Sequence, residues 1–275
     1  MQLEEKLHLI DRSMPLERAD APLLALRERI GDAIGRWWAP AVAALSRFRN
    51  ARMFHPEGHT FAGHIEPVRD TVFPELAARL DGHVLARLSP ALWRNGVEWL
   101  DVLGIALRIR RAVAVRDHHT APGDQDLLFA TIRSPLTMFA SPFTTDASDF
   151  VSSSYWAVSP FEAEGAGRVE LRLRANYGKQ GPGPRIARLR EAGRGGRARW
   201  TLEARRTLSW RWHPVAVITL DHEAVIDQAA LHFDPFLTGA DIVPVGLVHA
   251  IRRAVYDAGQ AARPPIGITG PVPVR

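Results

Sequence analysis

The sequence predicts an α+β domain, built as an antiparallel barrel or sandwich of about eight strands with helices at both ends of the chain. Short segments of strand-forming residues recur at fairly even spacing between residues 51 and 220. Apolar residues at helical spacing occupy the stretches before and after them. With 275 residues, 46% of them hydrophobic, the chain can bury a large core.

The chain shows no internal repeat and no convincing domain boundary, so we expect one domain over residues 1–275. Residues 1–50 would form an N-terminal arm and helices, because an amphipathic pattern runs from Met14 to about Arg49 with an interruption at Pro40. Residues 51–220 would form the barrel. Residues 221–275 would supply a C-terminal helix and a tail.

The expected strands are short, and segment 168–174 shows the pattern best because Val169, Leu171 and Leu173 alternate with charged residues. A short helix is expected around 74–80. The stretch 178–196 is expected to be a long loop within the β region, and its basic run 185–199 a solvated loop. The strands are expected at 60–65, 84–89, 102–109, 127–132, 155–158, 168–174, 200–205 and 215–220.

The composition excludes several kinds of chemistry. The chain has no cysteine, which removes disulfides, thiolate catalysis, iron–sulfur clusters and thiolate-ligated haem. The net charge is +5, but only Lys6 and Lys179 are lysines, so 33 of the 35 basic residues are arginine. We interpret this as a coding bias, and we expect no nucleic-acid partner. No signal peptide and no apolar run of about 20 residues is visible, so we expect a cytoplasmic protein without a membrane span.

The most unusual stretch is a predicted helix from Gly246 to Arg263, which Pro264 and Pro265 stop. Arg252, Tyr256, Gln260 and Arg263 fall within an arc of roughly 80° on one of its faces. A guanidinium beside a phenol lowers the pKa of the phenol and favours phenolate, which is one of the few axial ligands of haem iron. A second arginine can bind a carboxylate as a fork. The alternative is an ordinary amphipathic helix with a surface Arg–Tyr pair.

Four segments in this order resemble the haem-binding core of the catalase superfamily, including its short, catalase-related members. The stretch 52–58, Arg-Met-Phe-His-Pro-Glu-Gly, is similar to the distal segment of the family. Residues 86–89 look like its Arg-Phe-Ser strand, and residues 101–109 are similar to its Asp-x-x-Gly-Phe-Ala-x-Lys-Phe strand. Residues 233–235, Gly246 and the helix up to residue 263 resemble its proximal block.

The resemblance implies a catalase-like antiparallel barrel whose N-terminal and C-terminal helices cover a pocket for haem b. Tyr256 would be the metal ligand on the proximal side, with Arg252 pressing on its phenolate. His55 would be the distal acid–base residue, joined in catalysis by Arg252 and by the hydroxyl of Thr131. Haem contacts would come from Arg52, Phe54, Arg87, Arg252, Tyr256, Gln260 and Arg263.

Departures from the family pattern change the expected reaction. The stretch 126–132 carries no asparagine at the distal position, which Thr131 would only partly replace, and Phe54 is bulkier than the residue usual there. We therefore predict a haem peroxidase that acts on hydrogen peroxide or organic hydroperoxides with a small organic co-substrate, and with weak or no catalase activity. Phe54, Phe129, Phe139 and Phe143 would form either an apolar access path or barrel core.

Alternatives are hydroperoxide lysis or rearrangement, oxidation of a specialised metabolite on the same haem, and a non-enzymatic haem-binding or lipid-binding protein. An N-terminal arm is also compatible with a homodimer. A haem-free metal site of His55, His59 and His64 is a minor alternative, because His64 would point to the opposite strand face. The pair His118–His119 is expected at the surface.

Overall fold

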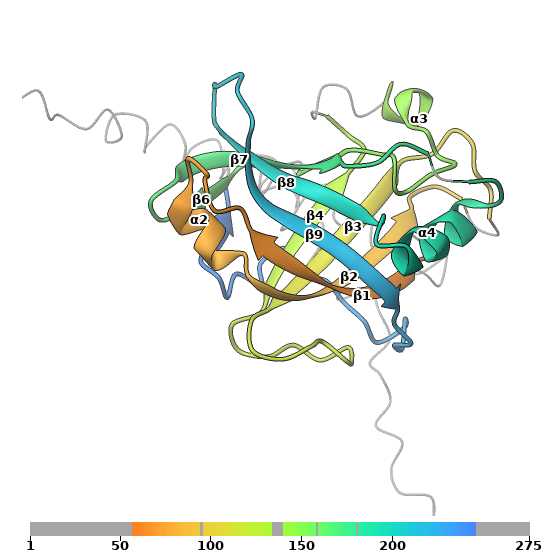
Figure 1. The fold of residues 1–275 in the computed structure, drawn as a ribbon, viewed down its shortest axis with the longest axis horizontal. Helices are drawn as coiled ribbons and strands as arrows, with labels where there is room; N and C mark the ends of the chain where they lie inside the picture. The colour runs from red at the N-terminus through yellow and green to blue at the C-terminus, as the bar shows by residue number, and fades with distance from the viewer. Residues whose placement is uncertain (1–56, 94–95, 134–139, 158, 180, 246–275) are drawn as a thin grey trace, which may run out of the picture.

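The computed structural model describes residues 57–93, 96–133, 140–157, 159–179 and 181–245, and these form a barrel with a few short helices (Figure 1). The predicted helices within 14–49 and 246–263 lie outside the described residues. The strands are β1 (His59–Pro67), β2 (Gly82–Pro90), β3 (Leu103–Arg110), β4 (Gln125–Ala130), β5 (Tyr155–Trp156), β6 (Phe161–Ala163), β7 (Gly167–Ala175), β8 (Arg199–Arg206), β9 (His213–Glu223) and β10 (Ile242–Pro244).

Eight of these strands close into an antiparallel ring. Neighbours run from β7 through β5, β4, β3, β2, β1 and β9 to β8, and the pairing of β7 with β8 completes the circle. The short strand β6 pairs with the first residues of β7, and β10 pairs with β6. The prediction of about eight antiparallel strands is therefore confirmed for the ring. The two extra strands were missed because three residues carry too little alternation to be recognised.

The barrel interior is filled by one continuous apolar cluster. Alternate residues of each strand point inward, as the two-residue period of a strand requires. Phe61 and Ile65 of β1 and Trp200 of β8 are each about 99% buried in it. The pairing of β1 with β9 shifts register between Ala62 and Gly63, and a Cβ atom at Gly63 would lie 2.0 Å from the carbonyl oxygen of Thr219. This close approach of β1 and β9 requires glycine.

The described residues form three helices: α2 (Pro74–Arg79) and α4 (Arg185–Arg194), which contact β9, and the short α3 (Ser141–Thr144). The expectation of a long loop over 178–196, with a solvated basic run at 185–199, was wrong. Arg185, Leu189 and Ala192 of α4 are buried, and Leu189 and Ala192 belong to the barrel core. The six arginines of residues 185–199 obscure the helical spacing of Leu189 and Ala192, so the sequence of this stretch looks like that of a charged loop.

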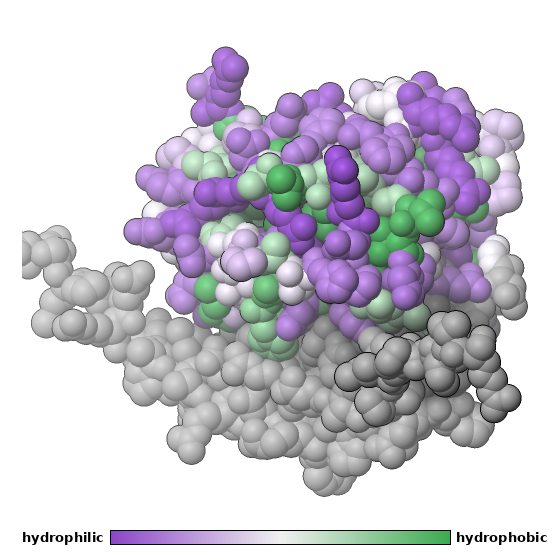
Figure 2. All heavy atoms as spheres, turned by 90° about the horizontal axis from the view of Figure 1, so that it is seen from below, coloured by the Kyte–Doolittle hydropathy of each residue, from purple (hydrophilic) through white to green (hydrophobic). Residues whose placement is uncertain are grey.

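The outward side of β1–β4 is also largely covered. Leu85 packs there with Val115 and Leu231 in a second apolar cluster. The covering chain comes from the β3–β4 connection and from the segment 224–237 that follows β9. On the side of the molecule seen in Figure 2, hydrophobic groups lie in separate patches among hydrophilic ones. Among the described residues, no helix is long and apolar enough to cross a bilayer.

Candidate functional site

The outward face of β1–β4 consists of four cross-strand rows, which the register of the three strand pairs defines. Two rows near the α2 end of the barrel carry charged pairs, whereas the two rows near the other end carry small side chains and one buried arginine. In order from the α2 end, the rows are His64, His83, Arg110 and Asp124; Ala62, Leu85, Arg108 and Asp126; Thr60, Arg87, Ala106 and Leu128; and Ser89, Gly104 and Ala130.

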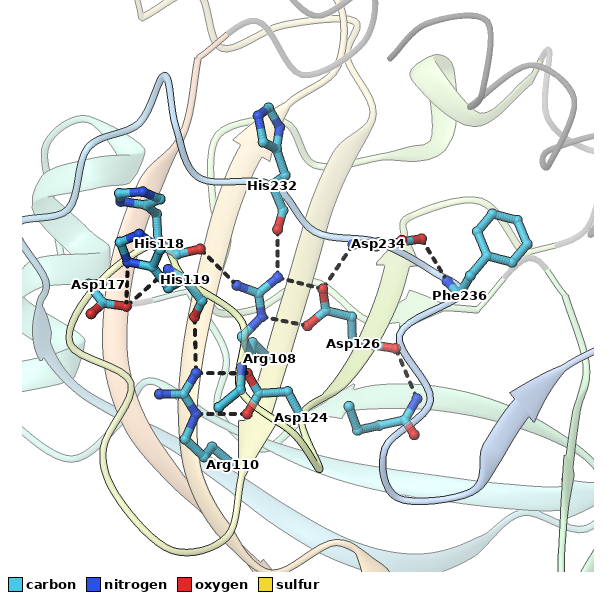
Figure 3. Close-up of polar contacts among 12 residues, drawn as sticks. Arg108, Arg110, Asp117, His118, His119, Asp124, Asp126, His232, Asp234 and Phe236 are labelled. Atoms are coloured by element: carbon cyan, nitrogen blue, oxygen red, sulfur yellow. Dashed lines mark hydrogen bonds and ion pairs between the residues drawn. The ribbon is translucent and has the colours of Figure 1, made fainter. Parts of the chain in front are cut away.

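Arg108 and Asp126 form a fully buried two-bond ion pair (Figure 3). Arg108 Nε and Nη2 donate to the two carboxylate oxygens at 2.9 and 2.8 Å. The guanidinium also donates to the carbonyl oxygens of His118 and His232, while the carboxylate accepts the backbone N–H of Asp234 at 2.8 Å. Burial raises the pKa of Asp126 to about 6, and Arg108 opposes that shift. The pair therefore fastens both covering segments to the barrel.

Arg110 and Asp124 repeat this arrangement one row away. Nε and Nη2 of Arg110 donate to the carboxylate, both at 2.7 Å, and Nη2 also donates to the carbonyl oxygen of His119 at 3.0 Å. The carboxylate accepts the N–H of Ala121. The side chain of His119 lies in an exposed loop beside Asp117, in agreement with the surface position expected for it. Both charged rows have their partners within the fold.

Arg87 is the one predicted haem contact that the structure describes, and it is 93% buried on the outward face. Its guanidinium lies across the backbone of Gly58, where a Cβ atom would meet the guanidinium carbon at 2.3 Å. Nε donates to Oε1 of Gln228 at 3.4 Å, and Nε2 of Gln228 donates to Oγ1 of Thr60 at 3.0 Å. Thr60 in turn donates to the carbonyl oxygen of Ala224 at 2.7 Å. This chain of bonds holds Arg87 at a defined place.

Beside Arg87 the sheet presents mostly small side chains, with Leu128 opposite Ala106 on β4. Ile105 and Leu107 point into the core, so Ala106 between them and Gly104 before them belong to the outward face. Ala130 pairs with Gly104 across β3 and β4, and Ala106 pairs with Arg87 across β2 and β3. We call Gly104, Ala106 and Ala130 the small-residue strip. A strip without long side chains, next to a buried cation, leaves room for a flat apolar ligand that carries an anionic group.

The described parts of all four resemblance segments meet on this outward face. Gly58 contacts Arg87, and the segment of Arg87 pairs with the segment of Ala106. Further along β3, Arg108 reaches the carbonyl oxygen of His232 and lies over the ring of Phe233, at 5.2 Å from its centroid. Apart from Arg87 and Thr131, the predicted catalytic and haem-binding residues lie outside the described residues. They are Arg52, Phe54, His55, Arg252, Tyr256, Gln260 and Arg263.

Thr131 follows the last residue of β4, and its hydroxyl has structural partners. Oγ1 of Thr131 accepts the N–H of Leu103 at 3.1 Å and lies 2.8 Å from Oγ1 of Thr145. The backbone N–H of Thr131 donates to the carbonyl oxygen of Leu103. These bonds join the ends of β3 and β4 to the turn after α3. The geometry therefore gives Thr131 a positioning role in holding the end of the small-residue strip.

The described aromatic and histidine candidates are separated from the strip. Phe129 is 96% buried in the barrel core, whereas Phe143 is 75% exposed on α3. His59 lies 3.8 Å from Glu223, and His64 lies 3.2 Å from Asp221, on opposite faces of β1. Burial lowers the pKa of His59. Among the described residues no group of three metal-ligating side chains occurs.

Thr60 and Gln228 were missed as site residues. They are 168 positions apart, and neither stands in a recognisable motif. Only the strand register and the return of the chain after β9 bring them to Arg87. The spacing of residues within one segment does not identify Thr60 and Gln228, because their relation to Arg87 is a contact between distant parts of the chain.

Comparisons with known proteins agree with this architecture. The structure is similar to that of a fungal catalase, with a TM-score of 0.56 at 13% sequence identity over 82% of this chain and 62% of that one. It is also similar to a bacterial catalase, with a TM-score of 0.53 at 15% identity over 82% of this chain and 60% of that one. The chain thus spans less than two thirds of either catalase. No protein-family model matches the chain, and no curated protein matches its sequence. The fold is catalase-like.

Proposed function

We propose that the chain is a haem-dependent peroxidase acting on hydrogen peroxide or organic hydroperoxides, with weak or no catalase activity. One observation carries the proposal: within a catalase-like barrel, a buried arginine, Arg87, lies beside a strip of Gly104, Ala106 and Ala130 on the outward face of the sheet. A protein that used this face only for packing would be expected to fill it with larger apolar side chains.

The chemistry of Arg87 and of the small-residue strip is compatible with haem b. The macrocycle is flat and largely apolar, and each of its two propionates is an anion that an arginine can bind as a fork. The small-residue strip would accept the ring, and Arg87 would hold one propionate. Glycine at position 58 supports this role, because a larger residue there would displace the guanidinium from its place.

The other wall of the site would come from residues outside the described range. Tyr256 would hold the iron through its phenolate oxygen, and Arg252 would keep that phenol ionised. Gln260 would contact the ring, and Arg52 and Arg263 would bind propionates. Phe54 would line the distal face. When bound, haem would supply the iron at which the peroxide O–O bond is cleaved.

The proton steps would belong to His55. A neutral imidazole can accept the proton of the incoming hydroperoxide and return it to the departing oxygen, so that this oxygen leaves as water or as an alcohol. A second hydrogen-bonding group on the distal face would favour hydrogen peroxide as reductant. Ala130 and Thr131 offer little of this kind, because Ala130 is apolar and the hydroxyl of Thr131 accepts the N–H of Leu103. A small organic co-substrate would therefore be the reductant.

The test compares two reactions of the purified chain after reconstitution with haem. We expect peroxide-dependent oxidation of a phenolic dye, little release of oxygen from hydrogen peroxide, and loss of dye oxidation in His55→Ala. Tyr256→Phe should change the visible spectrum of the bound haem. Dye oxidation that is unchanged in His55→Ala would refute the catalytic role of that residue, and a protein that binds no haem would refute the proposal.

A further inference from the structure

The connection between β8 and β9 is a hairpin that stands out from the barrel wall (Figure 1). Two large apolar side chains occupy its tip, with Leu208 93% and Trp210 91% exposed. Apolar side chains so fully in water have no role in packing the described fold. What distinguishes them from a single exposed apolar residue is that two large ones lie together at one projecting tip.

The backbone at the tip adds a second observation. Leu208 has φ of 71°, in the left-handed region where glycine or asparagine is usual. A leucine in that conformation costs about 1 kcal/mol relative to a residue that tolerates it. The tip therefore accepts backbone strain and exposes an apolar side chain at the same position. An ordinary surface turn would avoid both costs.

The base of the hairpin is rigid and basic. The ring of Trp212 lies between two guanidiniums, with Cζ of Arg172 at 4.3 Å and Cζ of Arg205 at 4.5 Å from its centroid. These arginines are in turn paired with Glu203 and Glu170 on the neighbouring strands. The aromatic ring thus packs against two arginines that are themselves in cross-strand ion pairs, which ties the base of the hairpin to β7 and β8.

The charge around the tip is positive. Strand β7 and the β8–β9 hairpin, residues 167–175 and 199–223, carry seven arginines against the four carboxylates of Glu170, Glu203, Asp221 and Glu223, which leaves a net charge of +3. Arg206 and Arg211, which flank the apolar tip, are exposed. An apolar wedge of leucine and tryptophan between exposed arginines matches the interfacial region of a bilayer with anionic headgroups.

We propose that the β8–β9 hairpin docks the protein on anionic lipid bilayers, with Leu208 and Trp210 inserted among the headgroups and Arg206 and Arg211 on the lipid phosphates. The attachment is peripheral and reversible, because two side chains bury far less apolar surface than a spanning helix. This inference goes beyond the proposed peroxidase function and stands without it. If both hold, hydroperoxides of lipid chains lie within reach of the protein.

The test is sedimentation of the full chain with vesicles of phosphatidylcholine alone or with 30% phosphatidylserine, a proportion of roughly the anionic content of a cytoplasmic leaflet. We expect binding to the anionic vesicles that weakens as salt is raised. Leu208→Asn should weaken it about tenfold by removing a buried apolar group. The same change should leave the thermal midpoint equal or higher, because asparagine tolerates the left-handed backbone. Trp210→Ser should weaken binding to a similar extent.

The matched control is Val225→Asn, which removes an apolar side chain that is 99% exposed at the end of β9, away from the hairpin. Its binding to vesicles should equal that of the wild type. The proposal is overturned if the wild type does not bind anionic vesicles, or if the hairpin variants bind as well as the wild type. It is also overturned if the hairpin changes abolish self-association of the chain while vesicle binding is unaffected.

Discussion

The two halves of one sheet face have different organisation. Near α2, Arg108 and Arg110 each form a two-bond pair with an aspartate, and their remaining donors reach backbone carbonyls of the covering loops. Near the other end, Arg87 lies beside glycine and alanine, and Gln228 and Thr60 hold it in place. In the first half, the Arg108–Asp126 and Arg110–Asp124 pairs hold the covering loops on the barrel. In the second half, Arg87 is buried next to the small-residue strip. Residue type alone does not distinguish the arginines, whereas their partners do.

The largest effect on stability is expected at the Arg108–Asp126 ion pair. Arg108→Met leaves the buried Asp126 without its cation and two carbonyl oxygens without a donor, so the free energy of unfolding should fall by about 3–5 kcal/mol at pH 8. Burial raises the pKa of Asp126 in the wild type to about 6. With its folded pKa above the unfolded value, this carboxyl favours folding most at low pH and loses that contribution as pH rises through the folded pKa.

Without Arg108 the folded pKa of Asp126 should rise further, so the penalty of Arg108→Met should be smaller at pH 5 than at pH 8. Urea unfolding at the two pH values measures both quantities. The control is Arg110→Met, where the arginine is 14% exposed and the loss should be smaller. If Arg108→Met lowered the free energy of unfolding by less than about 1 kcal/mol, or by the same amount at both pH values, the Arg108–Asp126 pair would not hold the covering loops on the barrel.

At Arg87 we expect a smaller effect on stability and a larger one on haem affinity. Arg87→Leu replaces the guanidinium by an apolar side chain and should change the free energy of unfolding by no more than about 1 kcal/mol, because it also removes a buried charge. Haem affinity should fall about tenfold, which is the effect of one lost charge-assisted bond. Titration with haem, followed by absorbance, measures this change. Equal haem affinity in Arg87→Leu and wild type would exclude Arg87 as a propionate ligand.

The smallest effect on activity is expected at Thr131. Thr131→Val removes the oxygen that accepts the N–H of Leu103, so the free energy of unfolding should fall by about 1 kcal/mol. Peroxide-dependent oxidation per bound haem should stay close to the wild-type rate, because the hydroxyl is used within the fold. A pH–rate profile altered by Thr131→Val would instead indicate that this hydroxyl takes part in proton transfer.

The barrel could be predicted from the sequence because its long strands alternate or run apolar over six residues or more. Segment 168–174, with Val169, Leu171 and Leu173, is strand β7 in the structure. Helix α4 could not be predicted, since four arginines in ten residues concealed the buried Leu189 and Ala192. The apolar residues of α4 follow helical spacing, but this pattern can be recognised only when the structure shows which of them are buried against the barrel.

The candidate site was predictable only in part. Arg87 was identified through a resemblance, and its buried position supports a binding role. Its neighbours Thr60, Gln228 and Gly104 are brought together by the strand register and by the return of the chain after β9. No local sequence pattern therefore identifies them. The distal and proximal residues His55 and Tyr256 remain predictions from the sequence.

Filling the small-residue strip tests the central claim most directly. Ala106 is only half-buried on the outward face, and Ala106→Phe would cover the place proposed for the haem ring while leaving Arg108, Asp126 and the core unchanged. We predict that the wild-type chain takes up haem with an absorption spectrum typical of phenolate ligation, and that Ala106→Phe folds with a similar thermal midpoint but takes up little haem. Equal haem uptake and identical spectra in the two proteins would contradict the account.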